Sequence, residues 1–270
     1  MLLGLDIGTS GVKGLLLSVE GEVKATHLVE YELLTPRPGW AEQDPESWWQ
    51  ATREVCRALL EKAASNAGDI KGVALSGQMH GSVFLDERGE VVRPCILWCD
   101  GRTGMECSEI IERFGQETLN KLTCNTALAG FTLPKVLWLM KHETENWKKT
   151  RQILLPKDYI RYKLTGTYSA EVSDAAGSLM FDVANRCWSR DLLEALDIPL
   201  NYLPQCYESS DVCGEVSSEA ESLTGLKAGT PVMGGGADNT CGAIGTGVIE
   251  EGQVLASLGT SGVVFSPSAA

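Results

Sequence analysis

Two glycine- and hydroxyl-rich segments contain the residue types that bind phosphate. Residues 6–12 read DIGTSGV and residues 257–263 read SLGTSGV, so the core GTSGV occurs twice, each time after an apolar run. Glycine lets the backbone of such a turn approach a phosphate, and the N–H groups and hydroxyls can then donate to its anionic oxygens. The candidate phosphate-binding residues are Gly8, Thr9, Ser10 and Lys13 in the first copy and Gly259, Thr260 and Ser261 in the second.

The first turn also carries a carboxylate, Asp6, at the end of the preceding apolar segment. A carboxylate in this position is suited to hold a hydrated Mg²⁺ ion rather than the phosphate itself. A single copy could equally be a hairpin turn that needs glycine and threonine only for its shape, whereas two copies favour phosphate binding. The chain has no GxxxxGK[ST] motif and no GxGxxG after its first strand, which excludes the usual P-loop and dinucleotide-binding loops.

The strands that must hold these turns can be read from apolar runs between turn residues. Residues 2–18 and the segment from residue 23 predict a β-meander around the first turn. Residues 70–76 and 82–85 predict two more strands, and residues 91–98 are expected to return as another. A buried strand is also expected at 231–239, where it runs into a glycine-rich corner.

Helical patterns alternate with these strands. Asp44 as N-cap and Pro45 at the first helical position mark a helix start, and an apolar stripe follows to residue 63. The irregular alternation of strands and helices indicates an α/β fold with a mixed sheet flanked by helices. Further helices are expected at 103–114, 133–142, 158–164, 191–196 and 240–244.

The repeated GTSGV core also bears on domain organisation. Because both copies lie in the same predicted strand–turn–strand setting, we interpret the second as the opening hairpin of a second, similarly built domain. A lone hairpin without a sheet to join would leave its backbone groups unpaired. We therefore expect residues 1–250 to form one domain and residues 251–270 to start a second, the rest of which follows Ala270.

The composition excludes several classes of protein. The 270 residues include 23 Lys and Arg against 36 Asp and Glu, a net charge of −13, which argues against nucleic-acid binding. Because no run of about 18 apolar residues and no signal peptide occurs, we expect a cytoplasmic protein without a membrane partner. The nine cysteines include no CxxC pair and are expected to be reduced thiols packed as small apolar residues.

Six segments, in order along the chain, carry a family resemblance. The segment at 130–142 resembles the N-terminal signature of the FGGY carbohydrate kinases, and the other five resemble the branch of that family that phosphorylates D-xylulose. The two GTSG turns are similar to the phosphate loops of the actin, hexokinase and Hsp70 superfamily. The six segments are GQMHG at 77–81, ILWCDGR at 96–102, GFTLPKVLWLMKH at 130–142, LPKDY at 155–159, SDAAG at 173–177 and GGGADN at 234–239.

This resemblance implies a ribonuclease H-like domain, with ATP bound in a cleft between two duplicated domains. It implies ATP and Mg²⁺ as cofactors and D-xylulose or a related ketose as the sugar. Asp238 would take the proton from the sugar hydroxyl, and Asp6 would hold the Mg²⁺–ATP complex directly or through water. Met79 and His80 would contact the ketose, and Asn239, beside the base, would give another polar contact.

Some of these residues also have simpler interpretations. His80 could be a loop residue whose ring is satisfied by the backbone. The 96–102 segment is expected to line or brace the sugar pocket, and its Asp100 and Arg102 could either form an ion pair or contact a ligand. The apolar stripe at 133–142 is interpreted as packing rather than chemistry.

The resemblance therefore predicts an ATP-dependent kinase that converts D-xylulose into D-xylulose 5-phosphate, with these residues as its N-terminal part. Two alternatives stay open: a family member that acts on another ketose or a polyol, and a non-catalytic sugar-binding half-domain. Because the nucleotide-binding half is expected to follow the 270 residues, we expect this part alone to be inactive and to bind ATP poorly. A homodimer is possible.

Overall fold

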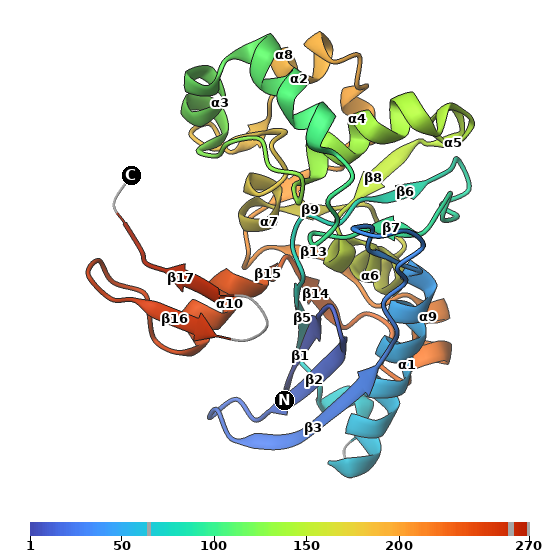
Figure 1. Cartoon of the computed structure of the whole chain (residues 1–270). Coiled ribbons are helices and arrows are strands. Elements are labelled where there is room, and N and C mark those ends of the chain that lie inside the picture. The colour runs from blue at the N-terminus through green and yellow to red at the C-terminus, as the bar shows by residue number, and fades with distance from the viewer. Residues whose placement is uncertain (64–65, 259–261, 269–270) are drawn as a thin grey trace.

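A mixed β-sheet forms the lower part of the molecule (Figure 1). The computed structural model describes residues 1–63, 66–258 and 262–268. Within these residues the sheet has seven strands. Six of them lie side by side in one continuous order, and the seventh, β15 (Gly236–Ala237), pairs with one of these six, β5. In spatial order those six are β13 (Val212–Glu215), β14 (Pro231–Met233), β5 (Gly72–Gly77), β1 (Leu2–Ile7), β2 (Gly11–Leu17) and β3 (Val23–Glu30).

The first three strands form the predicted meander. β1 pairs antiparallel with β2, and β2 with β3, whereas β5 runs parallel to β1 on its other side. Successive side chains of a strand point to opposite faces of the sheet. Leu3, Leu5 and Ile7 of β1 are buried on one face, while Leu2 and Asp6 are exposed on the other. One face of the sheet therefore holds the core, and the other is partly exposed and carries Asp6 and Lys13.

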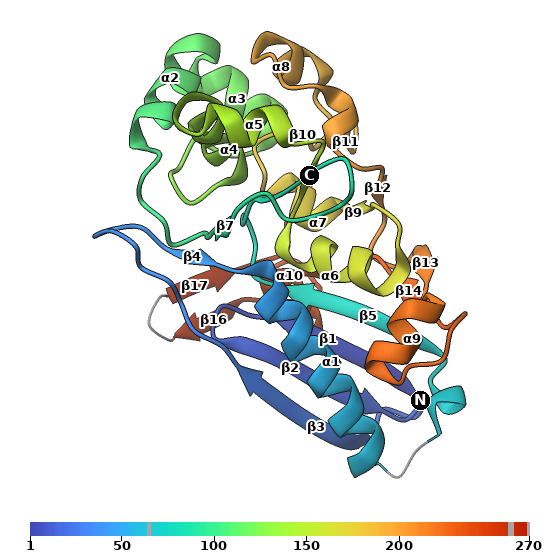
Figure 2. The same cartoon turned by 90° about the vertical axis from the view of Figure 1, so that its right-hand side faces the viewer.

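Helix α1 (Pro45–Lys62) covers the apolar face, with α6 (Pro156–Thr165) and α9 (Ser218–Thr224) beside it (Figure 2). The Asp44 carboxylate accepts the N–H of Glu46 and caps the start of α1, as expected from the sequence. A Cβ atom on Gly14 of β2 would lie 2.3 Å from Val55 and 2.6 Å from Leu59. Glycine at this position therefore lets α1 pack directly on the strand.

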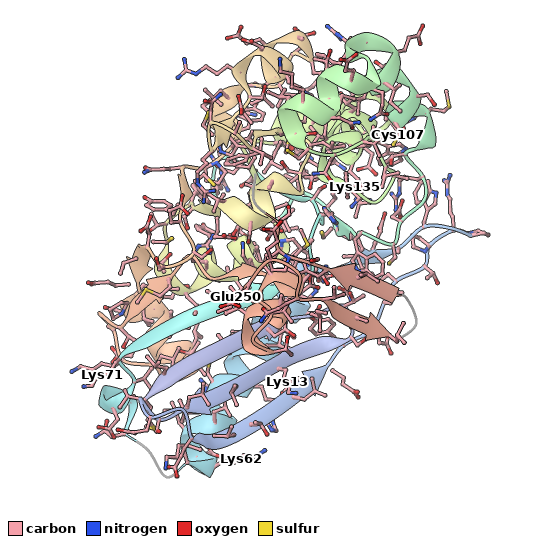
Figure 3. The ribbon with its side chains drawn as sticks, turned by 90° about the vertical axis from the view of Figure 1, so that its left-hand side faces the viewer. Lys13, Lys62, Lys71, Cys107, Lys135 and Glu250 are labelled. Atoms are coloured by element: carbon pink, nitrogen blue, oxygen red, sulfur yellow. The ribbon has the colours of Figure 1, made fainter. Side chains whose placement is uncertain are left out.

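The opposite side of the sheet faces α10 (Asp238–Gly245) and a separate hairpin of β16 (Leu255–Leu258) and β17 (Gly262–Phe265) (Figures 1 and 3). The antiparallel pairing of β16 with β17 confirms the strand–turn–strand setting predicted for the second GTSGV copy. The turn itself, with Gly259, Thr260 and Ser261, lies outside the described residues.

A second apolar core lies in the helical upper part of the molecule (Figure 1). Ile110, Leu133, Leu139 and Leu193 are among its fully buried side chains. Its main elements are α2 (Gly104–Phe114), α3 (Gln116–Thr123), α4 (Thr132–His142), α5 (Thr144–Lys149), α8 (Arg190–Ala195) and the antiparallel pair β6 (Val83–Leu85) and β8 (Gln152–Leu154).

Short elements connect the two parts of the chain. Among them, α7 (Val172–Ala176) lies between the sheet and the helical part (Figure 1). The other short elements are β4 (Glu42–Gln43), β7 (Cys95–Ile96), β9 (Ala170–Glu171), β10 (Phe181–Asp182), β11 (Cys187–Trp188), β12 (Cys206–Tyr207) and the 3₁₀ helices η1 (Ala67–Asp69) and η2 (Leu200–Tyr202).

The α/β class with a mixed sheet is confirmed, but the strand predicted at 91–98 is wrong. Only Cys95 and Ile96 form a strand there, paired with the two-residue β4. Pro94 has no N–H to donate, and the buried Arg93 pairs with Glu42 instead of extending a ladder. None of the helices in the described part of the chain is both long and apolar enough to cross a membrane.

Candidate functional site

Three parallel strands end at the same edge of the sheet. β1 ends at Ile7, β5 at Gly77 and β15 at Ala237, and Gly77 is in register with both of the other residues. Ligands of open α/β sheets bind at the carboxyl ends of the strands. The first GTSGV turn, the loop after β5 and Asp238 directly follow these ends, so the structure brings these three predicted segments together.

Two carboxylates, Asp6 and Asp238, lie at this edge. Asp6 is in register with Lys13 on one side and Ser76 on the other. Asp6 keeps part of its surface exposed, but the protein that surrounds its carboxyl raises the pKa by desolvation, although a hydrogen bond with Ser76 and the charge of Lys13 oppose the shift. Burial also raises the pKa of Asp238, and the negative charge of Asp6 raises it further. A hydrogen bond from the backbone N–H of Asn239 lowers this pKa but does not cancel the shift. A carboxylate with a raised pKa is a better proton acceptor at neutral pH.

The first GTSGV turn is closed by its own backbone. The Gly8 N–H donates to the Gly11 carbonyl (3.0 Å), and the Tyr31 N–H donates to the Ser10 carbonyl (3.2 Å). The Tyr31 hydroxyl also donates to the Gly8 carbonyl. Lys13 follows on β2, on the sheet face that α10 and the hairpin share (Figure 3). Tyr31, which directly follows β3, therefore helps to hold the turn in one conformation.

Two glutamines and a tryptophan tie this turn to the rest of the site. The Thr9 hydroxyl donates to Gln78 Oε1 (3.1 Å) and accepts the indole N–H of Trp98 (2.9 Å). Gln43 Nε2 donates to the Thr9 carbonyl (2.7 Å), and Gln78 Nε2 donates to Gln43 Oε1 (3.1 Å). Trp98 lies in the 96–102 segment that was expected to line or brace the pocket, and Gln78 lies in the GQMHG motif, but neither was assigned a contact with the turn. Gln43 had no sequence signal.

His80 adopts a left-handed backbone conformation, with φ of +67°. Its Nδ1 lies 2.7 Å from the carbonyl oxygen of Gly177, which can only accept, so Nδ1 carries the proton and Nε2 is an acceptor. Burial lowers the pKa of His80 to about 4, and the Gly177 carbonyl and Lys135 have smaller effects. The ring packs on Phe131 at a centroid distance of 4.4 Å. His80 therefore presents a neutral ring whose Nε2 accepts no hydrogen bond from the described residues.

Met79 and Asn239 bring the loop after β5 next to the start of α10. Asn239 Nδ2 lies 3.8 Å from Met79 Sδ, within reach of a weak hydrogen bond. Gly177, at the end of α7, packs directly against the same loop. A Cβ atom on Gly177 would lie only 2.8 Å from His80 Cε1 and 2.9 Å from Met79 Cε. The structure thus groups all four residues predicted to bind sugar, Met79, His80, Asp238 and Asn239, at one edge.

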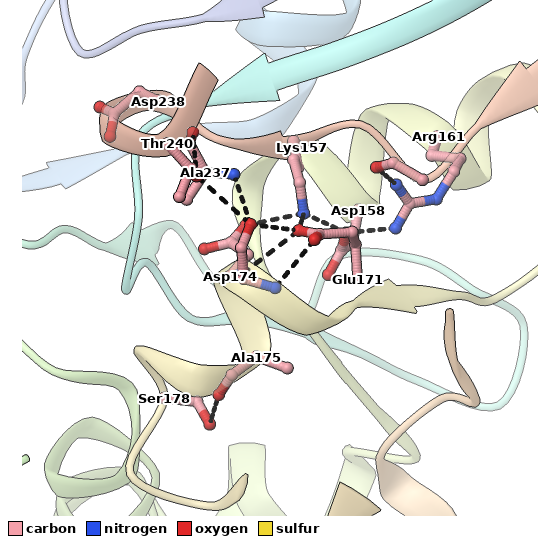
Figure 4. Close-up of polar contacts among 12 residues, drawn as sticks. Lys157, Asp158, Arg161, Glu171, Asp174, Ala175, Ser178, Ala237, Asp238 and Thr240 are labelled. Atoms are coloured by element: carbon pink, nitrogen blue, oxygen red, sulfur yellow. Dashed lines mark hydrogen bonds and ion pairs between the residues drawn. The ribbon is translucent and has the colours of Figure 1, made fainter. Parts of the chain in front are cut away.

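A buried ionic network supports Asp238 from below (Figure 4). Lys157 Nζ lies 2.9 Å from Asp174 Oδ2 and 3.6 Å from Glu171 Oε2, and all three side chains are fully buried. Glu171 Oε2 accepts the Ser173 hydroxyl (2.7 Å), and Ser173 Oγ accepts the N–H of Ala237 (3.0 Å), the residue before Asp238. The network therefore holds the backbone from which the proposed base projects.

Asp174 is a fully buried carboxyl of this network. Burial raises its pKa to about 7, against the attraction of Lys157. Its Oδ1 is buried and has no hydrogen-bond partner among the described residues. The nearby Lys157 has a raised pKa, because the carboxylates of Asp158 and Asp174 outweigh the effect of its burial.

Asp100 and Arg102 form the ion pair that was one of their two interpretations. Arg102 Nη2 lies 2.7 Å from Asp100 Oδ2, and the same carboxylate oxygen accepts the N–H of Ala41. The Arg102 guanidinium stacks over Trp40 at 3.6 Å and also pairs with Glu42. These contacts brace the start of the helical part, and both side chains are buried.

The donor set at this edge fits a magnesium ion that arrives with a nucleotide. No group of three His, Cys, Asp or Glu side chains within the described ranges is arranged to hold a metal ion. Asp6 and Asp238 offer carboxylate oxygens, and Mg²⁺ commonly binds through one or two carboxylates plus substrate phosphates and water. The residues therefore suit shared coordination rather than a metal site made by the protein alone.

A cavity of about 880 Å³ lies away from this edge, between α3, β11 and α8. Lys121, Trp188 and Arg190 are among its lining residues, and none of the predicted site residues lines it. The candidate site is instead an open sheet edge.

Comparison with known proteins gives consistent matches over almost the whole chain. Residues 1–245 match the model of the FGGY family of carbohydrate kinases, N-terminal domain. The chain is 43% identical to the xylulose kinase of Escherichia coli (strain K12) and 44% identical to that of Bacillus subtilis (strain 168), over 99% and 98% of its residues. The chain covers 54% and 53% of these two relatives and therefore spans about half of their length.

A solved structure gives the same match in three dimensions. The crystal structure of xylulose kinase from Rhodospirillum rubrum superposes with a TM-score of 0.92 at 32% sequence identity. The superposition covers 97% of this chain and 54% of that one. The fold described above is therefore that of a sugar-kinase N-terminal half, of the actin, hexokinase and ribonuclease H-like type.

Proposed function

Because the chain belongs to the FGGY family of carbohydrate kinases and contains the family's N-terminal domain, we propose that it is the sugar-binding half of an ATP-dependent xylulose kinase. The complete enzyme transfers the γ-phosphate of ATP to D-xylulose and yields D-xylulose 5-phosphate and ADP. The observation that carries this proposal is the meeting of Asp6, Asp238 and the His80 loop at the ends of three parallel strands.

Asp238 is the proposed base. Phosphoryl transfer needs an aligned hydroxyl and a group that takes its proton, while positioning and charge neutralisation lower most of the barrier. The raised pKa of Asp238 strengthens it as an acceptor. As the bond from the sugar oxygen to phosphorus forms and the bond to the ADP oxygen breaks, the hydroxyl proton passes to the Asp238 carboxylate.

His80 and its neighbours bind the sugar in this proposal. The neutral His80 ring accepts a sugar hydroxyl at Nε2, because Nδ1 is committed to the Gly177 carbonyl. Met79 supplies an apolar contact, and the Asn239 side-chain amide supplies a polar contact beside the base. A site whose sugar-binding side chains are neutral apart from the Asp238 carboxylate suits an uncharged sugar better than a carboxylate or phosphate substrate.

The nucleotide end of the site faces the GTSGV turns. Asp6 would hold the Mg²⁺ ion directly or through water, and the ion would supply positive charge to the phosphates. The backbone of Gly8, Thr9 and Ser10 and the ammonium of Lys13 face the phosphates from this half. We assign the same phosphate-binding role to Gly259, Thr260 and Ser261 of the second copy, from their sequence alone.

A second, nucleotide-binding domain completes the site in this proposal. Residues 1–250 are the sugar-binding domain and residues 251–270 begin the second, which agrees with relatives about twice as long. Ile244 and Ile249, beside the hairpin, are more than 60% exposed, and Leu258 of β16 is 90% exposed. Apolar side chains this exposed favour contact with a further domain. We place the enzyme in the cytoplasm, where ATP is available.

ADP release by the full-length protein tests the proposal. D-xylulose should give the highest kcat/KM in a panel with D-ribulose, other ketoses and glycerol. A higher value for another sugar would keep the kinase and reject D-xylulose as its substrate. Binding of sugar without any phosphorylation would instead identify a non-catalytic sugar-binding protein.

A further inference from the structure

Lys135, in the first turn of α4, is a fully buried cation that forms no ion pair with a carboxylate among the described residues. Its Nζ instead donates to two backbone carbonyls, those of His80 (2.9 Å) and Gly130 (2.6 Å). A buried ammonium is costly unless its hydrogen bonds are satisfied. The two hydrogen bonds therefore offset the cost of burying the Lys135 ammonium beneath these two loops. Lys135 is labelled in Figure 3.

The two carbonyls belong to the two segments that enclose the His80 ring. The His80 carbonyl sits in a backbone with positive φ, a conformation that is unfavourable for a residue with a side chain. Gly130 precedes Phe131, whose ring packs against His80. Thr132 Oγ1 is a second donor to the His80 carbonyl, at 3.2 Å.

We propose that Lys135 is a positioning residue for sugar binding: its ammonium joins the His80 loop to the Gly130–Phe131 segment and holds His80 Nε2 toward the substrate. This inference rests on the proposed function, because it assumes that His80 contacts the sugar. Lys135 itself lies beneath the loop, so it acts through His80.

The hydrogen bonds to both carbonyls do not depend on the charge of the lysine. Burial lowers the pKa of Lys135 to about 7, and Cys95 and Asp100 partly oppose the shift. A neutral amine keeps two N–H groups, which is enough for the two carbonyls. The positioning role therefore persists on both sides of neutral pH.

Lys135→Met in the full-length protein removes the donors and keeps the apolar stem. We expect the KM for D-xylulose to rise by about tenfold or more, because the loop loses its support, while the KM for ATP stays within about twofold. Lys141→Met is the matched control on the same helix: this lysine is exposed and pairs with Glu109. The control should leave both constants unchanged.

Thr132→Val gives a second, milder variant in case Lys135→Met folds poorly. It removes the other donor to the His80 carbonyl and leaves the buried charge in place, so we expect a smaller rise of about threefold in the sugar KM. A double-mutant cycle with His80→Ala separates positioning from general stability. If Lys135 acts through His80, the double variant should bind sugar no worse than His80→Ala alone.

Calorimetric binding of D-xylulose separates failure of this inference from failure of the proposed function. Wild-type protein that binds the sugar but does not phosphorylate it would reject the kinase and still allow the Lys135 cycle to be measured. Sugar binding that is unchanged in Lys135→Met and Thr132→Val, or additive with His80→Ala, would overturn the inference alone. Wild-type protein that binds no sugar would overturn both.

Discussion

His80 and Asp238 owe their chemical character to burial rather than to residue type alone. An exposed histidine titrates near pH 6.5, whereas burial lowers the pKa of His80 to about 4 and keeps its ring neutral. Burial moves Asp238 in the opposite direction, toward a stronger base. In the proposed site, the same loss of solvent thus gives His80 an acceptor for a sugar hydroxyl and gives Asp238 an affinity for its proton.

Asp238→Asn is predicted to lower kcat by roughly 10²–10⁴-fold in the full-length enzyme, since an amide cannot accept the proton. The sugar KM should change by less than about threefold because the amide has nearly the same shape. Steady-state kinetics with D-xylulose check this prediction. Unchanged turnover would remove Asp238 from the mechanism.

The pH profile provides a control for that variant. Protonated Asp238 cannot act as a base, so kcat/KM of the wild type should fall as pH drops through its pKa. Because that pKa is raised, the fall should begin above the ordinary value of 3.8. The Asn variant should lack this acid limb.

At the scale of elements, short segments rather than long helices position the residues of the proposed site. Helix α7 has only five residues, yet Glu171 caps its start, and Gly177 at its end touches the His80 loop. Ser173 of α7 holds the Ala237 N–H at the junction of β15 and α10. One short helix therefore contacts both the proposed sugar loop and the segment that carries the base.

Gly177→Ala tests this contact between α7 and the loop. The added Cβ would lie within 3 Å of His80 and Met79, so we expect the loop to shift and the sugar KM to rise by about tenfold, with little change for ATP. Gly104→Ala, at the start of α2, is the control because its Cβ would meet open space. Equal kinetics for both variants would show that the loop tolerates the displacement.

At the scale of the whole molecule, the sheet has two unlike faces. Helices α1, α6 and α9 cover one face, whereas Asp6 and Lys13 lie on the other with α10 and the hairpin (Figures 1 and 2). The exposed apolar residues Ile244, Ile249 and Leu258 lie at this second side. The face that carries the proposed site is thus also the face that the proposed second domain would approach.

The 270-residue chain alone is predicted to release no ADP with D-xylulose, while the full-length protein does. Without the second domain, water is not excluded and the nucleotide lacks half of its contacts. We also expect weak ATP binding to the isolated chain, which calorimetry can measure. Submicromolar ATP affinity of the chain would contradict the two-domain proposal.

The amino-acid sequence by itself determined the class of fold, most long elements and the identity of the candidate residues. Asp44 and Pro45 predicted the start of α1 because capping is a local interaction, and the apolar runs predicted β1, β2 and β5 because their side chains alternate locally. The strand expected at 91–98 failed because strand length depends on a distant partner, and β4 offers only two residues.

Only the tertiary structure decided how the candidate residues work together. Gln43 carries no motif, yet it holds Thr9 and Gln78 across long sequence separations. The tautomer of His80 depends on Gly177, 97 residues away, and the support of its loop depends on Lys135. Sequence patterns record local preferences, whereas burial and hydrogen-bond partners arise only when distant strands and helices pack, which is the physical reason for this division.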